Sequence, residues 1–193
     1  MKKLVIIALS FVLLISIFSF STIAAEEKAK VGVLLPGNIN DSGWNASVYE
    51  GLMSAKDKFD IEVNYMESVA QSDFEEAFRN YAVLDYDLII GHGYQFQKAA
   101  KKVAKSFPDS NFAILNGSTS MEPNLASYQF TNWQPGYISG VLAGFISEND
   151  HIGAIGGQEI PVISHALEAF EDGVHSVNED AKVVITYVDS WTD

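Results

Sequence analysis

The sequence contains no cysteine and has few basic residues. The absence of thiols excludes disulfides, thiolate metal sites and a lipid-modified amino-terminal cysteine. Only 12 Lys and Arg stand against 25 Asp and Glu, which gives a formal net charge of −13. This balance argues against binding to nucleic acid polymers or to anionic membrane surfaces, because both require basic patches. Uncharged small molecules remain possible ligands.

Motifs of the common catalytic sites are also missing. The chain has no G-x-S-x-G nucleophile elbow and no G-x-x-x-x-G-K-[ST] phosphate loop. Gly91-His92-Gly93 lacks the third glycine of a dinucleotide fingerprint, and His92 is better interpreted as a structural residue than as a catalytic base. The histidines do not have the spacing of metal ligands. We therefore expect a protein that is not an enzyme and that has no metal site and no cofactor.

Residues 1–25 have the pattern of a secretory signal peptide. Lys2 and Lys3 form a basic start, Leu4–Phe20 an apolar core, and 21–25 a cleavage region of mostly small residues. We predict cleavage after Ala24 or Ala25 and export to the periplasm or the extracellular side. The alternative is an uncleaved leader, because a stretch of this length could just span a bilayer. Membrane association is then expected only through this leader or through a membrane partner.

The rest of the chain alternates short apolar runs with segments of helical periodicity. This order is typical of an α/β fold with a parallel sheet and helices on both faces. Ser72-Asp73-Phe74-Glu75 matches a capping box and predicts a helix start at Ser72. Strands are predicted at residues 31–35, 61–65, 88–90, 112–115, 125–130, 152–155 and 183–188.

The pattern divides the chain into two lobes. Residues 30–147 contain enough βα units for a complete first lobe, and Glu148-Asn149-Asp150 is a short polar joint. Residues 151–193 offer only two strands and one helix, and two strands do not form a stable sheet alone. We therefore expect residues 151–193 to be the beginning of a second lobe, and the whole chain to be the amino-terminal piece of a longer two-lobe protein.

The first strand leads into a polar loop, residues 37–45, which precedes a helix. Asp41 or Ser42 can cap that helix, and Trp44 places a large flat ring at the loop's mouth. Ligands bind at the carboxyl ends of strands in open α/β sheets, so the loop is a candidate site. The alternative is that Trp44 and Asn45 merely pack and cap a helix start.

Six segments carry recognisable motifs in order: residues 40–45, 87–96, 103–109, 137–144, 155–163 and 190–193. Together they resemble the basic membrane protein (BMP) family of purine-binding receptors of ABC importers. The resemblance implies a fold similar to type I periplasmic binding proteins and a ligand held in the cleft between two lobes. Trp44 stands where many members carry Phe, and Thr131-Asn132-Trp133-Gln134 replaces a charged segment. The tryptophan form resembles a sub-group associated with free bases rather than nucleosides.

The resemblance implies a binding site for a purine base or nucleoside. Trp44 would stack on the base, Asp41 would accept a hydrogen bond from it, and Asn45 could donate and accept. Trp133 is either a second aromatic face or a seal at the lobe edge. The other expected contributors lie at strand ends or in the second lobe: Gly93, Tyr94, Gln95, Asn116, Gly117, Ile160, Pro161 and Trp191.

The resemblance also implies partners and a motion. An importer would supply a permease and an ATPase, and ligand binding would close the lobes about a hinge near Ser147–His151. A membrane-tethered sensory domain is the alternative, and a purine nucleosidase is a weaker one. Nothing in residues 26–193 resembles a helix-turn-helix, so direct DNA binding is not expected.

Overall fold

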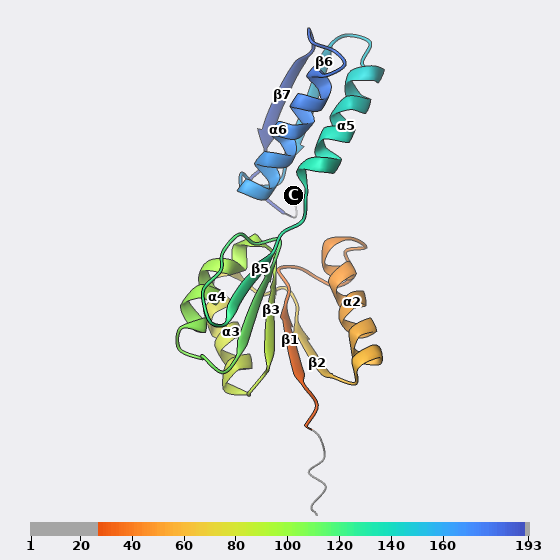
Figure 1. The fold of residues 1–193 in the computed structure, drawn as a ribbon. Helices are drawn as coiled ribbons and strands as arrows, with labels where there is room; N and C mark the ends of the chain where they lie inside the picture. Colours follow the sequence, from red (N-terminus) through yellow and green to blue (C-terminus); the bar gives the residue numbers. More distant parts are fainter. Residues whose placement is uncertain (1–26, 192–193) are drawn as a thin grey trace, which may run out of the picture.

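A five-stranded parallel sheet forms the first half of the protein, and the computed structural model describes residues 27–191 (Figure 1). Its strands lie in the order β2-β1-β3-β4-β5. Strand β1 lies between β2 and β3 and pairs with both, and Val31, for example, lies opposite both Val63 and Leu88. The predicted signal peptide, residues 1–25, lies outside the described residues. The predicted α/β class with a parallel sheet is confirmed.

Each predicted strand is present, with bounds that differ by at most two residues from the prediction. Inner strands such as β1 are apolar because both faces of the sheet are covered there, whereas β2 at the sheet edge alternates exposed and half-buried residues. The strands are β1 (Lys30–Leu34), β2 (Glu62–Met66), β3 (Leu88–His92), β4 (Asn111–Leu115), β5 (Leu125–Tyr128), β6 (His151–Gly156) and β7 (Lys182–Tyr187). The helices are α2 (Trp44–Phe59), α3 (Phe74–Val83), α4 (Gln97–Ala104), α5 (Trp133–Ile146) and α6 (Pro161–His175), with 3-10 turns η1 (Gln71–Asp73) and η2 (Tyr94–Phe96).

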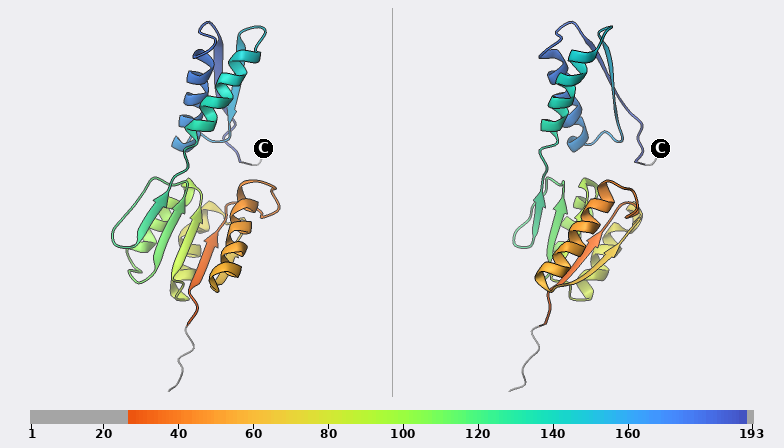
Figure 2. Two further views of the ribbon diagram at one scale, coloured as in Figure 1. Left: turned by 45° about the vertical axis from the view of Figure 1, so that its right-hand side comes forward. Right: turned by 90° about the vertical axis from the view of Figure 1, so that its right-hand side faces the viewer.

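Helices cover both faces of the first sheet, but unequally. Helices α3 and α4 lie on one face, where aromatic rings fill the core, and α2 lies on the other (Figures 1 and 2). The α3–α4 side contains the fully buried Phe78, Phe96 and Phe112, whereas the α2 side is a smaller cluster around Val33 and Leu52. Burial of such side chains, at about 25 cal/mol per Å² of apolar surface, is the main stabilising term.

The predicted capping box is wrong. Residues 71–73 form the 3-10 turn η1, so α3 begins at Phe74 rather than at Ser72. The Ser72 hydroxyl donates to the carboxylate of Asp73 instead of accepting from the backbone. Glu75 lies on the helix surface and pairs with Lys102 of α4. The motif fits the sequence pattern, but a local side-chain contact competes with the cap.

The second unit consists of the parallel pair β6–β7 with α5 and α6 packed tightly against each other. Helix α5 approaches α6 through glycines. A Cβ added at Gly140 would lie 1.9 Å from the Phe170 carbonyl oxygen, and one at Gly173 would lie 2.1 Å from that of Tyr137. Only glycine permits this backbone contact. Pro161 occupies the first turn of α6, where its missing N–H costs nothing.

The packing divides the chain at a different point from the predicted joint. The prediction includes α5 in the first lobe, which it ends at residue 147, but the structure packs α5 on α6. Residues 129–132 connect β5 to α5 and cross between the two units (Figure 1). The physical reason is that glycines of α5, such as Gly136 and Gly140, let its backbone lie directly against the backbone of α6. The strands of the two sheets point their carboxyl ends toward each other.

Candidate binding site

The loop before α2 is organised by the carboxylate of Asp41. Its Oδ1 accepts from the backbone N–H of Gly43 and Ala46, both at 2.9 Å. Its Oδ2 accepts from the backbone N–H and the side-chain amide of Asn45, both at 2.8 Å. Asp41 therefore caps the first turn of α2, as one of the two predicted capping residues. Each carboxylate oxygen already accepts two hydrogen bonds, so a ligand N–H could bind Asp41 only by replacing one of them.

These hydrogen bonds determine the charge state of Asp41. Burial pushes the pKa of this carboxyl upward, but the backbone N–H groups of Asn45, Ala46 and Gly43 and the Asn45 side chain outweigh it. The net effect holds the pKa of Asp41 well below its ordinary value. Asp41 is consequently an anion throughout the physiological range and gives the rim of the site a fixed negative charge.

Asn45 is the polar side chain in this loop that keeps an unused acceptor. The residue is buried, and its amide nitrogen donates to Asp41. Its Oδ1 has no hydrogen-bond partner among the described residues. An added Cβ at Gly37 would lie 2.6 Å from the Asn45 amide nitrogen, so Gly37 leaves the space that Asn45 occupies. A buried carbonyl oxygen without a partner is costly, which makes Asn45 Oδ1 a candidate acceptor for a ligand N–H.

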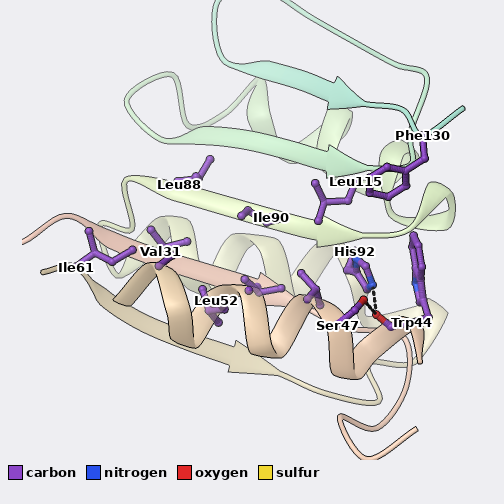
Figure 3. Close-up of a pocket in the computed structure, with 14 residues that line it drawn as sticks. Val31, Trp44, Ser47, Leu52, Ile61, Leu88, Ile90, His92, Leu115 and Phe130 are labelled. Carbon is purple, nitrogen blue, oxygen red and sulfur yellow. Dashed lines mark hydrogen bonds between the residues drawn. The ribbon is translucent and has the colours of Figure 1, made fainter. Parts of the chain in front are cut away.

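Trp44 lies across the carboxyl end of β3, with one face of its indole covered (Figure 3). The His92 ring stacks on that face, with ring centroids 4.0 Å apart and planes 18° apart. Phe130 meets Trp44 edge-on, with centroids 6.0 Å apart. Trp44 remains 39% exposed. In the close-up the opposite indole face points away from the strands, so a flat ligand could stack there.

An apolar pocket with a volume of about 420 Å³ lies behind this ring pair, between α2 and the first sheet (Figure 3). Apart from Ser47 and the rings of Trp44 and His92, its lining consists of glycine and apolar side chains from α2, β1, β3, β4 and their neighbours. Val31, Ile90 and Leu115 are examples from three adjacent strands. The Trp44 and His92 rings form part of the wall of this pocket, and the rest of its lining offers almost no hydrogen-bonding groups.

The predicted residues after β3 divide between two sides of the sheet. Gly93 has φ +135°, a backbone conformation that favours glycine, and it directs the chain into η2. Tyr94 is half-buried at the start of that turn. Gln95 lines a polar groove with Arg79 and Lys98 on the α3–α4 side, not the pocket beside Trp44. Gly93 and Tyr94 remain rim candidates, whereas Gln95 would have to change direction to contribute.

Asn116 and Gly117 follow β4 and have structural contacts. Asn116 is buried, and its Oδ1 accepts a 3.0 Å hydrogen bond from the amide of Asn132, which precedes α5. Its own N–H donates to the Tyr128 carbonyl at 2.6 Å. A Cβ at Gly117 would lie 2.5 Å from the Ile114 side chain, so this glycine serves close packing. Asn116 thus links the first sheet to the crossing segment.

The predicted residues of the second unit lie at the end that faces the first unit. Trp133 begins α5 and is exposed, while Ile160 and Pro161 stand at the start of α6. Trp191 follows β7 and packs against Gly157, where a Cβ would lie 3.0 Å from the indole. The starts of α5 and α6 and the carboxyl end of β7 lie at the end of the second unit that faces the first unit (Figures 1 and 2).

Two residues of the site were missed by sequence reasoning: His92 as a contact of Trp44, and Phe130. His92 was interpreted as a structural residue, and its position at the end of β3 was the available signal. Phe130 lies beyond the last strand of the sheet, where an exposed aromatic at a strand end could have suggested a role. Among residues 27–191, no group of His, Asp and Glu side chains is placed to hold a metal ion.

Two α/β units whose strands point their carboxyl ends toward each other, with the exposed Trp44 at one of these ends, are the arrangement expected of two-lobed solute-binding proteins. The profile of the family "ABC transporter substrate-binding protein PnrA-like" matches residues 28–193, and the chain belongs to this family, which is also called Bmp. Members of this family are substrate-binding proteins rather than enzymes. The resemblance inferred from sequence motifs is therefore confirmed.

Curated relatives carry different ligand names. A putative ABC transporter glucose-binding protein of Haloferax volcanii is 31% identical, over 80% of this chain and 40% of the relative. The ABC transporter nucleoside-binding protein BmpA of Lactococcus lactis is 30% identical, over 85% and 48% respectively. A purine-binding protein of Brucella abortus is 30% identical, over 88% and 49%. The chain thus spans about half the length of the curated relatives it matches.

Solved structures agree with this assignment. A solute-binding protein of an ABC transporter system from Aeropyrum pernix has a TM-score of 0.75 and 25% identity, covering 82% of this chain and 47% of that one. A transcriptional activator of the comK gene from Bacillus halodurans has a TM-score of 0.65 and 30% identity, covering 86% and 56%. Within residues 27–191, no helix is long and apolar enough to cross a bilayer.

Proposed function

We propose that this chain is the ligand-binding part of an exported receptor of an ABC importer, and that its ligand is a purine base or nucleoside. The observation that carries the proposal is the Trp44 indole, fixed on one face by His92 and open on the other at the ends of the strands. A purine is flat and uncharged, and stacking on a tryptophan is worth about 1–3 kcal/mol per base. The nucleoside-binding and purine-binding relatives support the same ligand class.

Polar groups near Trp44 in the sequence would supply the hydrogen bonds to the ligand. Asn45 Oδ1, unpaired among the described residues, can accept from an exocyclic amine or a ring N–H. The Asp41 anion holds Asn45 and the first turn of α2 in place, which assigns it mainly to organising the loop. Trp133, Ile160, Pro161 and Trp191 would approach from the second unit when a ligand is bound. Gly93, Tyr94, Asn116 and Gly117 would complete the rim.

Ligand enclosure would use the segment 129–132 as its hinge. This segment connects the two units, and its Asn132 is tied to Asn116 at the end of β4. Hinges are short stretches that absorb large backbone changes between rigid bodies. The permease and ATPase of an importer are the proposed partners, and we expect no nucleic acid polymer, no metal and no cofactor. Export depends on residues 1–25, whose predicted cleavage can be checked by the intact mass of the secreted protein.

A ligand panel tests the proposal. Titrations monitored by protein NMR detect Kd values into the millimolar range, which suits a chain that offers one main stacking wall. We expect adenine, adenosine and guanosine to shift the Trp44 indole resonance, while glucose and an amino-acid mixture leave it unchanged. Glucose belongs in the panel because of the name of the Haloferax relative. Shifts with glucose and none with any purine would overturn the proposed ligand class.

A membrane-tethered sensor is the second candidate function. Its support is the similarity to the Bacillus halodurans protein, which is described as a transcriptional activator of the comK gene. A sensor and an importer receptor bind a ligand in the same way, so the binding site cannot separate them. The reading frames beside the gene can: a permease and an ATPase favour the importer. Incubation with inosine, followed by an assay for released base, tests the weaker nucleosidase alternative.

A further inference from the structure

His92 occupies a position that hydrophobic packing does not explain. It is the last residue of β3 and is 2% exposed, yet it carries two polar ring nitrogens. Its Nε2 has one partner, and its Nδ1 has none among the described residues. Burying a polar group without a partner costs free energy. A purely structural position at this depth would favour an apolar side chain of similar size.

Both strong contacts of His92 are made with a single residue. Nε2 lies 2.8 Å from the Trp44 carbonyl oxygen, and the imidazole stacks on the Trp44 indole at 4.0 Å (Figure 3). A carbonyl can only accept, so Nε2 carries the proton and donates it. One ring thereby holds the backbone of Trp44 and the plane of its side chain at once. Trp44 is the first residue of α2, so the same contacts also fix where that helix begins.

We propose that His92 is the positioning residue of the binding site, which orients the Trp44 indole and reserves its outer face for the ligand. The ligand part of this inference rests on the proposed function. Without the His92 ring, the indole could rotate into the apolar pocket behind it, which is lined by Val33, Leu115 and Phe130 among others. The stacking face would then no longer stand at the strand ends. Rigid first contacts of this kind reduce the ordering cost of ligand binding.

The surroundings favour the neutral form of His92. Burial lowers the pKa of His92, and the hydrogen bond to Trp44 and the charge of Asp41 oppose this only in part. Asp41 is the charged group that acts on it, from the loop before α2. The side chains that line the pocket from α2, β1, β3 and β4 are otherwise neutral. A proton on Nδ1 would therefore be buried without a partner, and acid should loosen the stack.

Two variants separate the contacts. His92→Phe keeps an aromatic ring against Trp44 but removes the donor, whereas His92→Gln keeps a donor but removes the ring. His165→Gln is the matched control, because His165 is an exposed histidine of α6. Far-UV circular dichroism confirms that each variant folds. Trp133→Phe and Trp191→Phe provide a background in which Trp44 is the remaining one of the three tryptophans.

The first readout needs no ligand. In this background, we expect Trp44 emission to change with pH with a midpoint below the ordinary histidine pKa of 6.5, because a protonated imidazole quenches a stacked indole. The transition should persist in His165→Gln and vanish in both His92 variants. A flat profile between pH 7.5 and 4, or the same transition in His92→Phe, would overturn the proposed contact.

The second readout is affinity for adenine and guanosine at pH 7.5, measured with all tryptophans present. Loss of either contact should weaken binding about three- to ten-fold in both His92 variants, while His165→Gln stays within about two-fold. Unchanged affinity in both variants would overturn the positioning role and leave the proposed function intact. Absence of purine binding in the parent would instead contradict the proposed function, and the emission profile would still decide whether His92 orients Trp44.

Discussion

At the scale of single residues, the loop before α2 depends on one carboxylate. Asp41 accepts four hydrogen bonds from three residues at the start of α2: Gly43, Asn45 and Ala46. The candidate acceptor Asn45 and the stacking residue Trp44 both belong to the segment that these bonds hold. The binding loop is therefore built around a helix cap rather than around the apolar core.

Replacement of Asp41 tests this role. We expect Asp41→Ala to lower the free energy of unfolding by about 0.5–2 kcal/mol, as for other lost helix caps. Asp57→Ala, an exposed position later in α2, should change it by less than about 0.5 kcal/mol. Urea denaturation at pH 7 measures both. Equal effects of the two substitutions would show that the cap is dispensable.

The difference in stability between wild type and Asp41→Ala should depend on pH. The folded state depresses the pKa of Asp41 below its unfolded value of 3.8, so the unfolded state binds the proton first as pH falls. The stabilisation is fully present above 3.8 and is lost progressively below it. The difference in unfolding free energy between wild type and Asp41→Ala should therefore shrink when denaturation is measured below pH 3.8. A difference that stays constant or grows in acid would contradict the assignment.

At the scale of elements, α5 and α6 form one packed pair because glycine allows their backbones to touch. We expect Gly140→Ala to destabilise this pair by about 1–3 kcal/mol, since the added methyl would meet the Phe170 carbonyl. Gly51→Ala in α2 is the matched control, because a Cβ there meets nothing within 4 Å. That substitution should stabilise α2 by about 0.5–1 kcal/mol.

Hydrogen exchange resolves the two effects by element. Gly140→Ala should lower the protection of amides in α5 and α6 and leave β1 and β3 unchanged, whereas Gly51→Ala should raise protection in α2. Loss of protection in the first sheet, with α5 and α6 unaffected, would show that the two helices are not held by this contact. Measurement of individual amides is preferable to a single melting curve, because two units need not unfold together.

The sequence predicts strands and helices better than it predicts their partners. Apolar runs such as Val31–Leu35 locate β1 because a buried strand of a parallel sheet has to be apolar on both sides. The placement of α5 could not be read in the same way. Its glycines and large apolar residues are compatible with several neighbours, and the fit to the α6 backbone exists only in three dimensions.

The site shows the same limit. Loop residues Asp41, Trp44 and Asn45 were predicted from their position after a strand, and they do lie together. The contact between Trp44 and His92, 48 positions apart, depends on the parallel pairing of β1 with β3. Gln95 shows the converse, because a residue at the right strand end turns to the opposite side of the sheet. The local sequence pattern shows that a residue follows a strand, but it does not show to which side of the sheet its side chain turns.

At the scale of the whole molecule, the two units differ in how well they are covered. The first sheet has helices on both faces, whereas the β6–β7 pair leaves Ile155 and Val184 exposed, and α5 leaves Leu142 and Phe145 exposed. Few buried contacts imply a low free energy of local opening. We therefore expect limited proteolysis to cut first within residues 129–132 or later in the chain and to leave a core ending near Tyr128. Mass spectrometry of the fragments checks this, and early cuts within β1, β3 or β4 would contradict it.

The central claim is that the outer face of Trp44 binds a purine, and calorimetric or NMR titration of a Trp44 series tests it most directly. Wild type, Trp44→Phe and Trp44→Ala are compared with the same purine, with Asp57→Ala as a control outside the site. We predict that Trp44→Ala raises the Kd by roughly ten-fold or more, and that Trp44→Phe keeps most of the affinity because an aromatic face survives. Purine binding of equal strength in wild type and Trp44→Ala would contradict the claim.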